Sequence, residues 1–175
     1  MNIVLIGFMA TGKSTLGKAL AKRLNWEYLD TDKLIEQKAG CSIPRIFAEK
    51  GESYFRQLEA SVAKELASAE KKVIATGGGF PLNPENIHQL RPSSLIVCLT
   101  AAPEVIYQRA SRDTNRPLLQ VADPLARIKQ LLAERASCYA NADLAIDTSL
   151  WDPEVLIADI LAEMKRRGLR IDGDC

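Results

Sequence analysis

The sequence is poor in the residues that build structural metal sites. It contains a single histidine, His88, and its four cysteines include no Cys-x-x-Cys pair. Because a closed zinc site needs four such ligands, usually in closely spaced pairs, this composition argues against one. Cysteines without a disulfide-like pattern are typical of a reducing compartment, so we expect a cytoplasmic protein.

Neither an excess of one charge nor a long apolar run is present. The 23 Lys and Arg residues nearly balance the 22 Asp and Glu residues, for a formal net charge of +1, which gives a nucleic-acid partner little support. No stretch approaches the roughly 20 apolar residues that cross a bilayer. The chain opens directly on an expected strand, so no signal or transit peptide is expected either. We expect a monomer whose partners are small molecules.

What the sequence does contain is a regular alternation of apolar runs and amphipathic segments. This pattern predicts an α/β fold, a parallel sheet with helices on both faces, in one domain spanning 1–175. The expected strands are 2–6, 26–30, 72–76, 94–99 and 143–147. The expected helices are 13–24, 31–39, 51–69, 102–111, 124–140 and 153–167. Prolines stand where helices can begin, at Pro84, Pro103, Pro124 and Pro153.

Two connections are longer than a parallel crossover requires. About 40 residues separate the second and third expected strands, whereas a helical crossover needs about a dozen. We interpret residues from about 31 to 70 as an insertion that binds the acceptor. Residues 111–123 are polar with little periodicity, which in a compact domain is typical of a functional lid.

The strongest motif is the loop Gly7-Phe8-Met9-Ala10-Thr11-Gly12-Lys13-Ser14-Thr15, which matches G-x-x-x-x-G-K-[ST] between an apolar strand and a helix. In this context backbone N–H groups wrap phosphate oxygens, and the helix N-terminus adds partial positive charge. Lys13 is expected to reach the β- and γ-phosphates of ATP, and Ser14 to bind Mg²⁺. The predicted nucleotide site also includes Ala10, Thr11, Gly12 and Thr15.

Two aspartates, Asp30 and Asp32, end the second expected strand. Side chains two residues apart in a strand point the same way, so both carboxylates can face one cleft at the carboxyl edge of the sheet. The third and fourth strands lack the terminal Asp that many P-loop enzymes carry, so Asp30 is the expected Mg²⁺ ligand, directly or through water. Asp32 is a candidate for the same cleft, or alternatively the N-cap of a helix that begins at Lys33.

Charged residues also fall on helix faces that are otherwise apolar. On the helix expected at 51–69, Glu59 lies inside the apolar stripe and Arg56 at its edge. Arg135 lies within the apolar arc of the helix expected at 124–140. An inward Arg is costly unless an anion meets it. Glu59 can meet Arg56, whereas Arg135 either binds a ligand carboxylate, reaches out to solvent or pairs with a distant Asp.

Glycines and further arginines complete the candidate set. Gly77-Gly78-Gly79 follow the third strand, where they permit close approach to a ligand or form a tight turn. The lid region carries Arg109, Arg112 and Arg116, of which Arg112 is expected to be solvated. Arg116 precedes the stiff apolar segment 117–119, and an arginine on a closing lid can stabilise a transferring phosphoryl group.

Together these pieces resemble the shikimate kinase family, in the family's order and over most of the chain. The matching segments are the phosphate loop at 7–17, Asp-Thr-Asp-x-x-Ile-Glu at 30–36, Ile-Phe-x-x-x-Gly-Glu-x-x-Phe-Arg-x-x-Glu at 46–59, the triple glycine, Arg-Pro-Leu-Leu at 116–119 and Glu-Arg-x-x-x-Tyr at 134–139. The resemblance implies a three-layer α/β/α fold with a five-stranded parallel sheet in the order 2-3-1-4-5. It also implies transfer of the γ-phosphoryl group of ATP to the 3-hydroxyl of shikimate, in aromatic amino-acid biosynthesis.

The resemblance also implies roles for single residues. Shikimate would be held by Asp32, Arg56, Gly78 and Arg135, with the two arginines on its carboxylate. Asp32 would orient or deprotonate the attacking hydroxyl, and Arg116 would close on the phosphates. Arg109 resembles the family's nucleotide-side arginine. The supporting walls would include Phe47, Phe55, Glu59 and Pro117.

Three places depart from the family's usual pattern. Ala10 stands where Gly is frequent, which is tolerable if φ is negative there. Phe80-Pro81 after the triple glycine are bulky enough to narrow the acceptor pocket. Trp151 lies where the family often has an Arg beside adenine, and either stacks on the base or is an ordinary surface or core residue.

Other classes of protein remain open at this stage. A gluconate-type or nucleotide-type kinase would share the phosphate loop and lid without needing the pair of Arg56 and Arg135. A non-catalytic relative that binds a metabolite would be expected to have lost Lys13, Asp32 or a lid arginine, and all of these are present. A regulatory P-loop switch would leave the acceptor-binding insertion unexplained.

Overall fold

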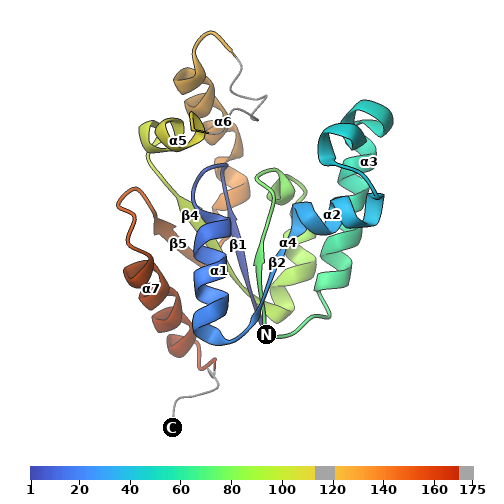
Figure 1. The fold of residues 1–175 in the computed structure, drawn as a ribbon. Coiled ribbons are helices and arrows are strands. Elements are labelled where there is room, and N and C mark those ends of the chain that lie inside the picture. The colour runs from blue at the N-terminus through green and yellow to red at the C-terminus, as the bar shows by residue number, and fades with distance from the viewer. Residues whose placement is uncertain (113–120, 170–175) are drawn as a thin grey trace.

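The computed structural model describes residues 1–112 and 121–169, and it confirms the expected α/β fold (Figure 1). One parallel sheet is formed by β1 (Asn2–Gly7), β2 (Glu27–Asp30), β3 (Lys72–Ala75), β4 (Ser94–Thr100) and β5 (Leu144–Asp147). The strand order is β2-β3-β1-β4-β5, as the family resemblance implied. None of the helices in the described ranges combines the length and apolarity that a membrane span requires.

Helices cover both faces of the sheet because side chains of the central strand β1 alternate between them. The helices are α1 (Lys13–Leu24), α2 (Thr31–Ala39), α3 (Ile43–Leu66), α4 (Pro84–Leu90), α5 (Pro103–Ala110), α6 (Pro124–Tyr139) and α7 (Pro153–Arg166). Ile3 and Leu5 share a core with α1 and α7, whereas Val4 and Ile6 share the opposite core with α2, α3 and α4. Phe8, just beyond β1, packs with α5 and α6 above the carboxyl ends of the strands (Figure 1).

Two helical features differ from the expectation. Helix α3 begins eight residues earlier than the expected residue 51, and Gly51 interrupts it with φ 79° and ψ 173°. Helix α4 was not among the expected helices, although Pro84 marks its first turn and the Asn83 side chain accepts a hydrogen bond from the N–H of Glu85 (3.1 Å). Seven residues are too few for a periodic pattern to stand out, which explains the omission.

The strand register brings three loops to one edge of the sheet. Ala75 of β3 pairs with Leu5 of β1 on one side and with Asp30 of β2 on the other. The phosphate loop, the start of α2 and the triple glycine therefore leave the sheet side by side, at the edge where open α/β sheets bind ligands.

Candidate active site

A cleft of about 420 Å³ opens at this edge of the sheet, and most of the predicted site residues line it. Its walls are formed by Met9, Ala10, Gly12, Lys13, Ser14, Thr15, Asp30, Asp32, Thr76, Gly77, Gly78 and Arg109. Thr11 is buried instead, and its hydroxyl donates to the Phe8 carbonyl (2.8 Å), which fastens the loop. Arg116 and segment 117–119 lie outside the described residues, so their roles stay predictions.

Lys13 is held inside the phosphate loop. Its ammonium group donates to the carbonyl oxygens of Gly7 and Phe8, at 2.8 Å each, and the residue is only 9% exposed. Gly12, directly before α1, adopts φ 95°, a conformation that favours glycine. The loop therefore presents a fixed positive charge at the N-terminus of a helix, the arrangement that binds phosphates.

Ala10 was expected to fit the loop if its φ is negative. Its φ is 59° instead, in the left-handed region. A left-handed conformation costs a residue with a Cβ about 1–2 kcal/mol. Replacing Ala10 by Gly should therefore stabilise the protein by about 0.5–1 kcal/mol after the larger entropy of the unfolded glycine is subtracted. For a chain of this size, this corresponds to a rise in melting temperature of about 1–4 °C.

The matched control is Ala19→Gly in the middle of α1. The same change in a helical conformation should destabilise the protein by about 1 kcal/mol. Calorimetric melting of both variants checks the prediction. A fall in melting temperature for Ala10→Gly similar to that for Ala19→Gly would show that the loop does not strain Ala10.

Asp30, and not Asp32, caps the helix that follows the second strand. Helix α2 begins at Thr31, and Asp30 is its N-cap, since its Oδ1 accepts a hydrogen bond from the N–H of Asp32 (3.0 Å). The proposed capping of a helix at Lys33 by Asp32 is therefore wrong. The other carboxylate oxygen of Asp30 accepts a hydrogen bond from the Tyr28 hydroxyl (3.3 Å).

Asp32 lies half-buried against the triple glycine. A Cβ built on Gly77 would come within 2.4 Å of Oδ1 of Asp32, so only glycine leaves room for this carboxylate. Burial raises the pKa of Asp32 to about 6, and the negative charges of Asp30 and Glu59 add to the increase, against the attraction of Lys13. A carboxylate with such a pKa is suited to accept a proton near neutral pH.

The last of the three glycines makes room for Arg56 in the same way. A Cβ on Gly79 would lie 2.9 Å from Nη1 of Arg56, which donates to the Gly79 carbonyl (3.3 Å). The expectation that Phe80 narrows the acceptor pocket is wrong. Its side chain is 0% exposed and packs into the core with Ile87 and Leu90, so it faces away from the cleft.

Arg56 meets Glu59, as the helix geometry predicted. Nη1 of Arg56 lies 2.7 Å from Oε2 of Glu59, and Glu59 is 1% exposed. Glu52, one turn before, also contacts Arg56 (3.0 Å). Burial alone would lower the pKa of Arg56, but its hydrogen bonds to Glu59 and Glu52 outweigh burial and raise it. Glu52 is exposed, so a ligand carboxylate can replace it on the guanidinium without leaving a buried charge unpaired.

Arg135 turns toward the domain, as expected. Its guanidinium carbon lies 5.5 Å from the centre of the Phe8 ring. Its positive charge partly offsets the rise that burial causes in the pKa of Tyr139, whose hydroxyl donates to the Gly78 carbonyl (3.3 Å). Of the carboxylates in the described ranges, none lies within ion-pair distance of Arg135, so pairing with a distant Asp is not observed there. A guanidinium on an aromatic ring beside the phosphate loop is suited to bind a carboxylate.

Arg109 stands at the other end of the cleft. It donates to the carbonyl of Ala10 (3.4 Å) and to the hydroxyl of Thr148 (3.1 Å). Its guanidinium carbon is 5.6 Å from the centre of the Trp151 ring, and the same ring would clash with a Cβ on Gly12, at 2.3 Å. Trp151 therefore packs against the phosphate loop. It is 37% exposed, so it is not a core residue.

Sequence reasoning missed three supporting residues. Tyr28 donates to Asp30, Tyr139 donates to the Gly78 carbonyl, and Glu52 forms an ion pair with Arg56. Two of them left a signal in the sequence. Tyr139 falls in the apolar arc of α6 one turn after Arg135, and Glu52 precedes Arg56 by four residues, the spacing of an ion pair on one helix face.

Comparison with known proteins gives a consistent family. The sequence profile described as shikimate kinase matches residues 9–165. The shikimate kinase of Thermodesulfovibrio yellowstonii is 46% identical over 165 residues, covering 94% of this chain and 95% of its own. That of Caldanaerobacter subterraneus is 46% identical over 172 residues, covering 98% of both. The shikimate kinase from Acinetobacter baumannii, solved in complex with shikimate, has a TM-score of 0.88 at 39% identity, covering 97% of this chain and 95% of that one.

Proposed function

The chain belongs to the shikimate kinase family, and from this premise we propose that it transfers the γ-phosphoryl group of ATP to the 3-hydroxyl of shikimate, giving shikimate 3-phosphate and ADP. The observation that carries the proposal is the position of Asp32. Its carboxylate, with a pKa raised to about 6, lies in the same cleft as the phosphate loop and against the triple glycine. An acceptor hydroxyl beside Asp32 would therefore lie close to a bound γ-phosphate.

The transfer needs little chemistry from the protein beyond positioning and charge. The hydroxyl oxygen attacks the γ-phosphorus, the bond to the β–γ bridging oxygen breaks, and ADP leaves with that oxygen. The hydroxyl proton passes to the carboxylate of Asp32. Lys13 and the loop N–H groups stabilise the negative charge on the phosphate oxygens, and Arg56 and Arg135 hold the acceptor's carboxylate. Arg109 would contact the nucleotide.

We propose that Mg²⁺ is held by Ser14 and, through water, by Asp30. The oxygen donors fit this ion. The Ser14 hydroxyl is exposed to the cleft, whereas both oxygens of Asp30 already accept a hydrogen bond, which favours contact through water. Bound there, Mg²⁺ would neutralise charge on the β- and γ-phosphates.

Loss of the Tyr28 hydroxyl should weaken this metal site. Tyr28→Phe removes the hydroxyl that donates to Asp30 and helps to orient this carboxylate, so Mn²⁺ affinity in the presence of ADP should fall about 10-fold. Electron paramagnetic resonance of free Mn²⁺ measures this directly. The control is Tyr54→Phe, on the exposed side of α3, which should change nothing. Equal Mn²⁺ affinity in both variants, or full activity in excess chelator, would contradict the metal site.

Arg135 should determine acceptor affinity. Arg135→Lys keeps the charge but loses the planar fork, and Arg135→Ala loses both. Losing a charge-assisted pair in a desolvated site costs about 2–4 kcal/mol, so shikimate should bind roughly 30- to 1000-fold more weakly to the Ala variant. Binding of an ATP analogue should change little. Calorimetric titration with each ligand separates the two, and loss of the nucleotide alone would show that the acceptor site is misplaced.

The proposed activity is tested by a coupled ADP-release assay with ATP and Mg²⁺. Shikimate should be phosphorylated with a kcat/KM well above those of gluconate, quinate and nucleoside monophosphates. Quinate is the informative comparison, because it has a six-membered carbon ring and a carboxylate like shikimate but differs in the other ring positions. A nucleoside monophosphate or gluconate as the preferred acceptor would identify one of the alternative kinase classes.

A further inference from the structure

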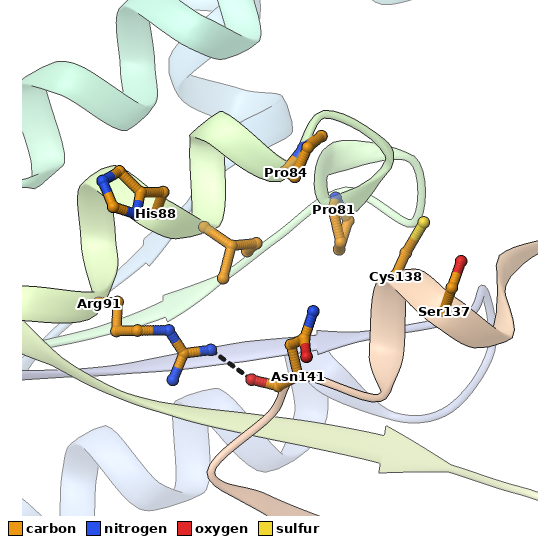
Figure 2. A pocket seen from close by; sticks show the side chains of 8 residues that line it. Pro81, Pro84, His88, Arg91, Ser137, Cys138 and Asn141 are labelled. Carbon is orange, nitrogen blue, oxygen red and sulfur yellow. Dashed lines mark hydrogen bonds between the residues drawn. The ribbon is translucent and has the colours of Figure 1, made fainter.

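A second pocket, larger than the cleft, lies on the outer face of the molecule between α4 and the carboxyl end of α6 (Figure 2). Its volume is about 520 Å³, compared with about 420 Å³ for the cleft, and this size suits a small organic ligand. Pro81, Pro84 and Ile87 form an apolar wall. The proposed reaction uses none of its residues.

The polar residues of this pocket favour an anion. They are His88, Arg91, Ser137, Cys138 and Asn141, and no carboxylate is found among the described residues that line it. The side chains of His88, Ser137 and Asn141 form no hydrogen bond with any residue in the described ranges, so they remain available as donors. Among the described residues of the wall, the guanidinium of Arg91, 40% exposed, carries the one permanent charge.

Arg91 shares its carboxylate partner with a second arginine. Its Nη1 lies 3.1 Å from Oδ1 of Asp143, but the same oxygen is 3.0 Å from Nη1 of Arg167. The second oxygen of Asp143 accepts from the Ile96 N–H (2.8 Å), so this carboxylate is fixed behind the pocket. Glu163 in turn serves both Arg166 and Arg167. Within residues 1–112 and 121–169, three guanidinium groups thus share two carboxylates.

From this arrangement we propose that the pocket binds a small carboxylate with a flat apolar body. Figure 2 shows Arg91 and Asn141 at one end of the pocket and the two prolines at the other, which matches a ligand that is charged at one end only. The guanidinium would hold the carboxylate, and the ring or chain would lie against Pro81 and Pro84.

The pocket is built on two elements that also reach the cleft. Pro81 follows the triple glycine by two residues, and the Gly79 carbonyl accepts from Arg56. Ser137 and Cys138 stand on α6 between Arg135 and Tyr139, which holds the Gly78 carbonyl. A ligand in the pocket therefore contacts both elements that position the acceptor-site arginines. This coupling rests on the proposed function, whereas binding in the pocket does not.

The only histidine of the chain gives a direct test. In the untagged protein the Hε1 proton of His88 has a unique NMR signal, which should shift saturably with benzoate, with a Kd on the order of 1 mM. Benzamide, of the same shape without charge, should shift it at least 10-fold less effectively. Ser137→Trp, which fills the pocket and leaves the pair of Arg91 and Asp143 intact, should abolish the shift.

Charge variants distinguish benzoate binding in the pocket from binding in the cleft and from non-specific attraction to surface charge. Arg91→Gln should weaken benzoate at least 10-fold, whereas Lys129→Gln, which removes an exposed charge from another part of α6, should not. Arg135→Ala should leave the benzoate-dependent shift of His88 unchanged, because Arg135 is not among the residues that line the pocket. Any of three results would overturn the site. These are a His88 shift with benzamide as large as that with benzoate, equal benzoate affinities of Arg91→Gln and Lys129→Gln, or no shift up to about 10 mM benzoate. These outcomes are independent of whether shikimate is phosphorylated.

Coupling between the sites has its own readout. If the pocket is linked to the acceptor site, benzoate changes the Kd of shikimate by the same factor by which shikimate changes the Kd of benzoate. Ser137→Trp should remove the effect of benzoate on shikimate binding. Persistence of that effect in Ser137→Trp would show that benzoate competes directly in the cleft, and the coupling would then be wrong.

Discussion

Replacing Lys13 by Met is expected to reduce kcat/KM by at least about 10³-fold and to leave the fold intact. The ammonium group lies at the centre of the phosphate loop, where it donates to the carbonyls of Gly7 and Phe8. In the proposed reaction it would stabilise charge on the transferring phosphoryl group, and loss of one such fixed donor typically costs 10²–10³-fold in rate. Loss of a full charge should cost more.

Steady-state kinetics and thermal melting of the same preparation check this prediction. Met keeps the apolar stem of the side chain, so the melting temperature should change by only a few degrees. Lys22→Met, in the last turn of α1, is the matched control and should keep full activity. A folded Lys13→Met protein with near-native turnover would remove the assignment of this loop to phosphate binding.

Asp32→Asn is the second change with a large expected effect. An amide cannot accept the proton of the acceptor hydroxyl, so kcat should fall about 10²- to 10⁴-fold, the usual contribution of a general base. The amide keeps the size of the carboxylate beside Gly77, so substrate affinities should change much less. An unchanged kcat would leave Asp32 as a binding residue only.

The same substitution should stabilise the protein without metal or nucleotide. The pKa of Asp32 is raised in the folded state from 3.8 to about 6, so the folded state favours the protonated form. This contribution to stability is fully present below about pH 4 and is lost as the pH rises through about 6. Above pH 6 Asp32→Asn should therefore be more stable than the parent, by up to about 3 kcal/mol, and the difference should vanish toward pH 4.

Asp30→Asn provides the contrast, measured by urea unfolding in chelator between pH 4 and 8. Asp30 caps α2, and Asn is an equally good cap, so the helix start should be preserved. Because the charge of Asp30 is only one of the causes that raise the pKa of Asp32, this variant should show a stabilisation that grows with pH but is clearly smaller than that of Asp32→Asn. Stability curves of Asp32→Asn and the parent that run parallel across this pH range would contradict the raised pKa of Asp32.

Much of the fold and the outline of the site could be predicted from the sequence. Each strand is a distinct apolar run, so the ends of all five strands were predicted to within about two residues. The phosphate loop needs glycines and a lysine in one continuous segment, and such a motif is visible without a structure. The inward directions of Glu59 and Arg135 followed from helical periodicity alone, because both helices have a clear apolar stripe.

What could not be predicted depends on backbone conformation and on contacts distant in sequence. The positive φ of Ala10 is imposed by the loop, not by the residue, since alanine alone favours negative φ. Capping by Asp30 instead of Asp32 depends on where α2 begins, and helix starts are uncertain by a residue or two. Phe80 packs inward because η1 (Phe80–Leu82) turns it there, and the sequence carries no sign of that short turn.

Because Trp151 contacts the phosphate loop, its fluorescence should report on ligand binding there. The chain has two tryptophans, and Trp26 lies beyond the far end of α1, about 18 Å of helix away from Gly12. The indole of Trp151 touches Gly12 and faces the guanidinium of Arg109, so anything that enters the loop changes the surroundings of one emitter and leaves the other as an internal reference. Occupancy of the loop can thus be followed by intrinsic fluorescence in real time, with no label attached.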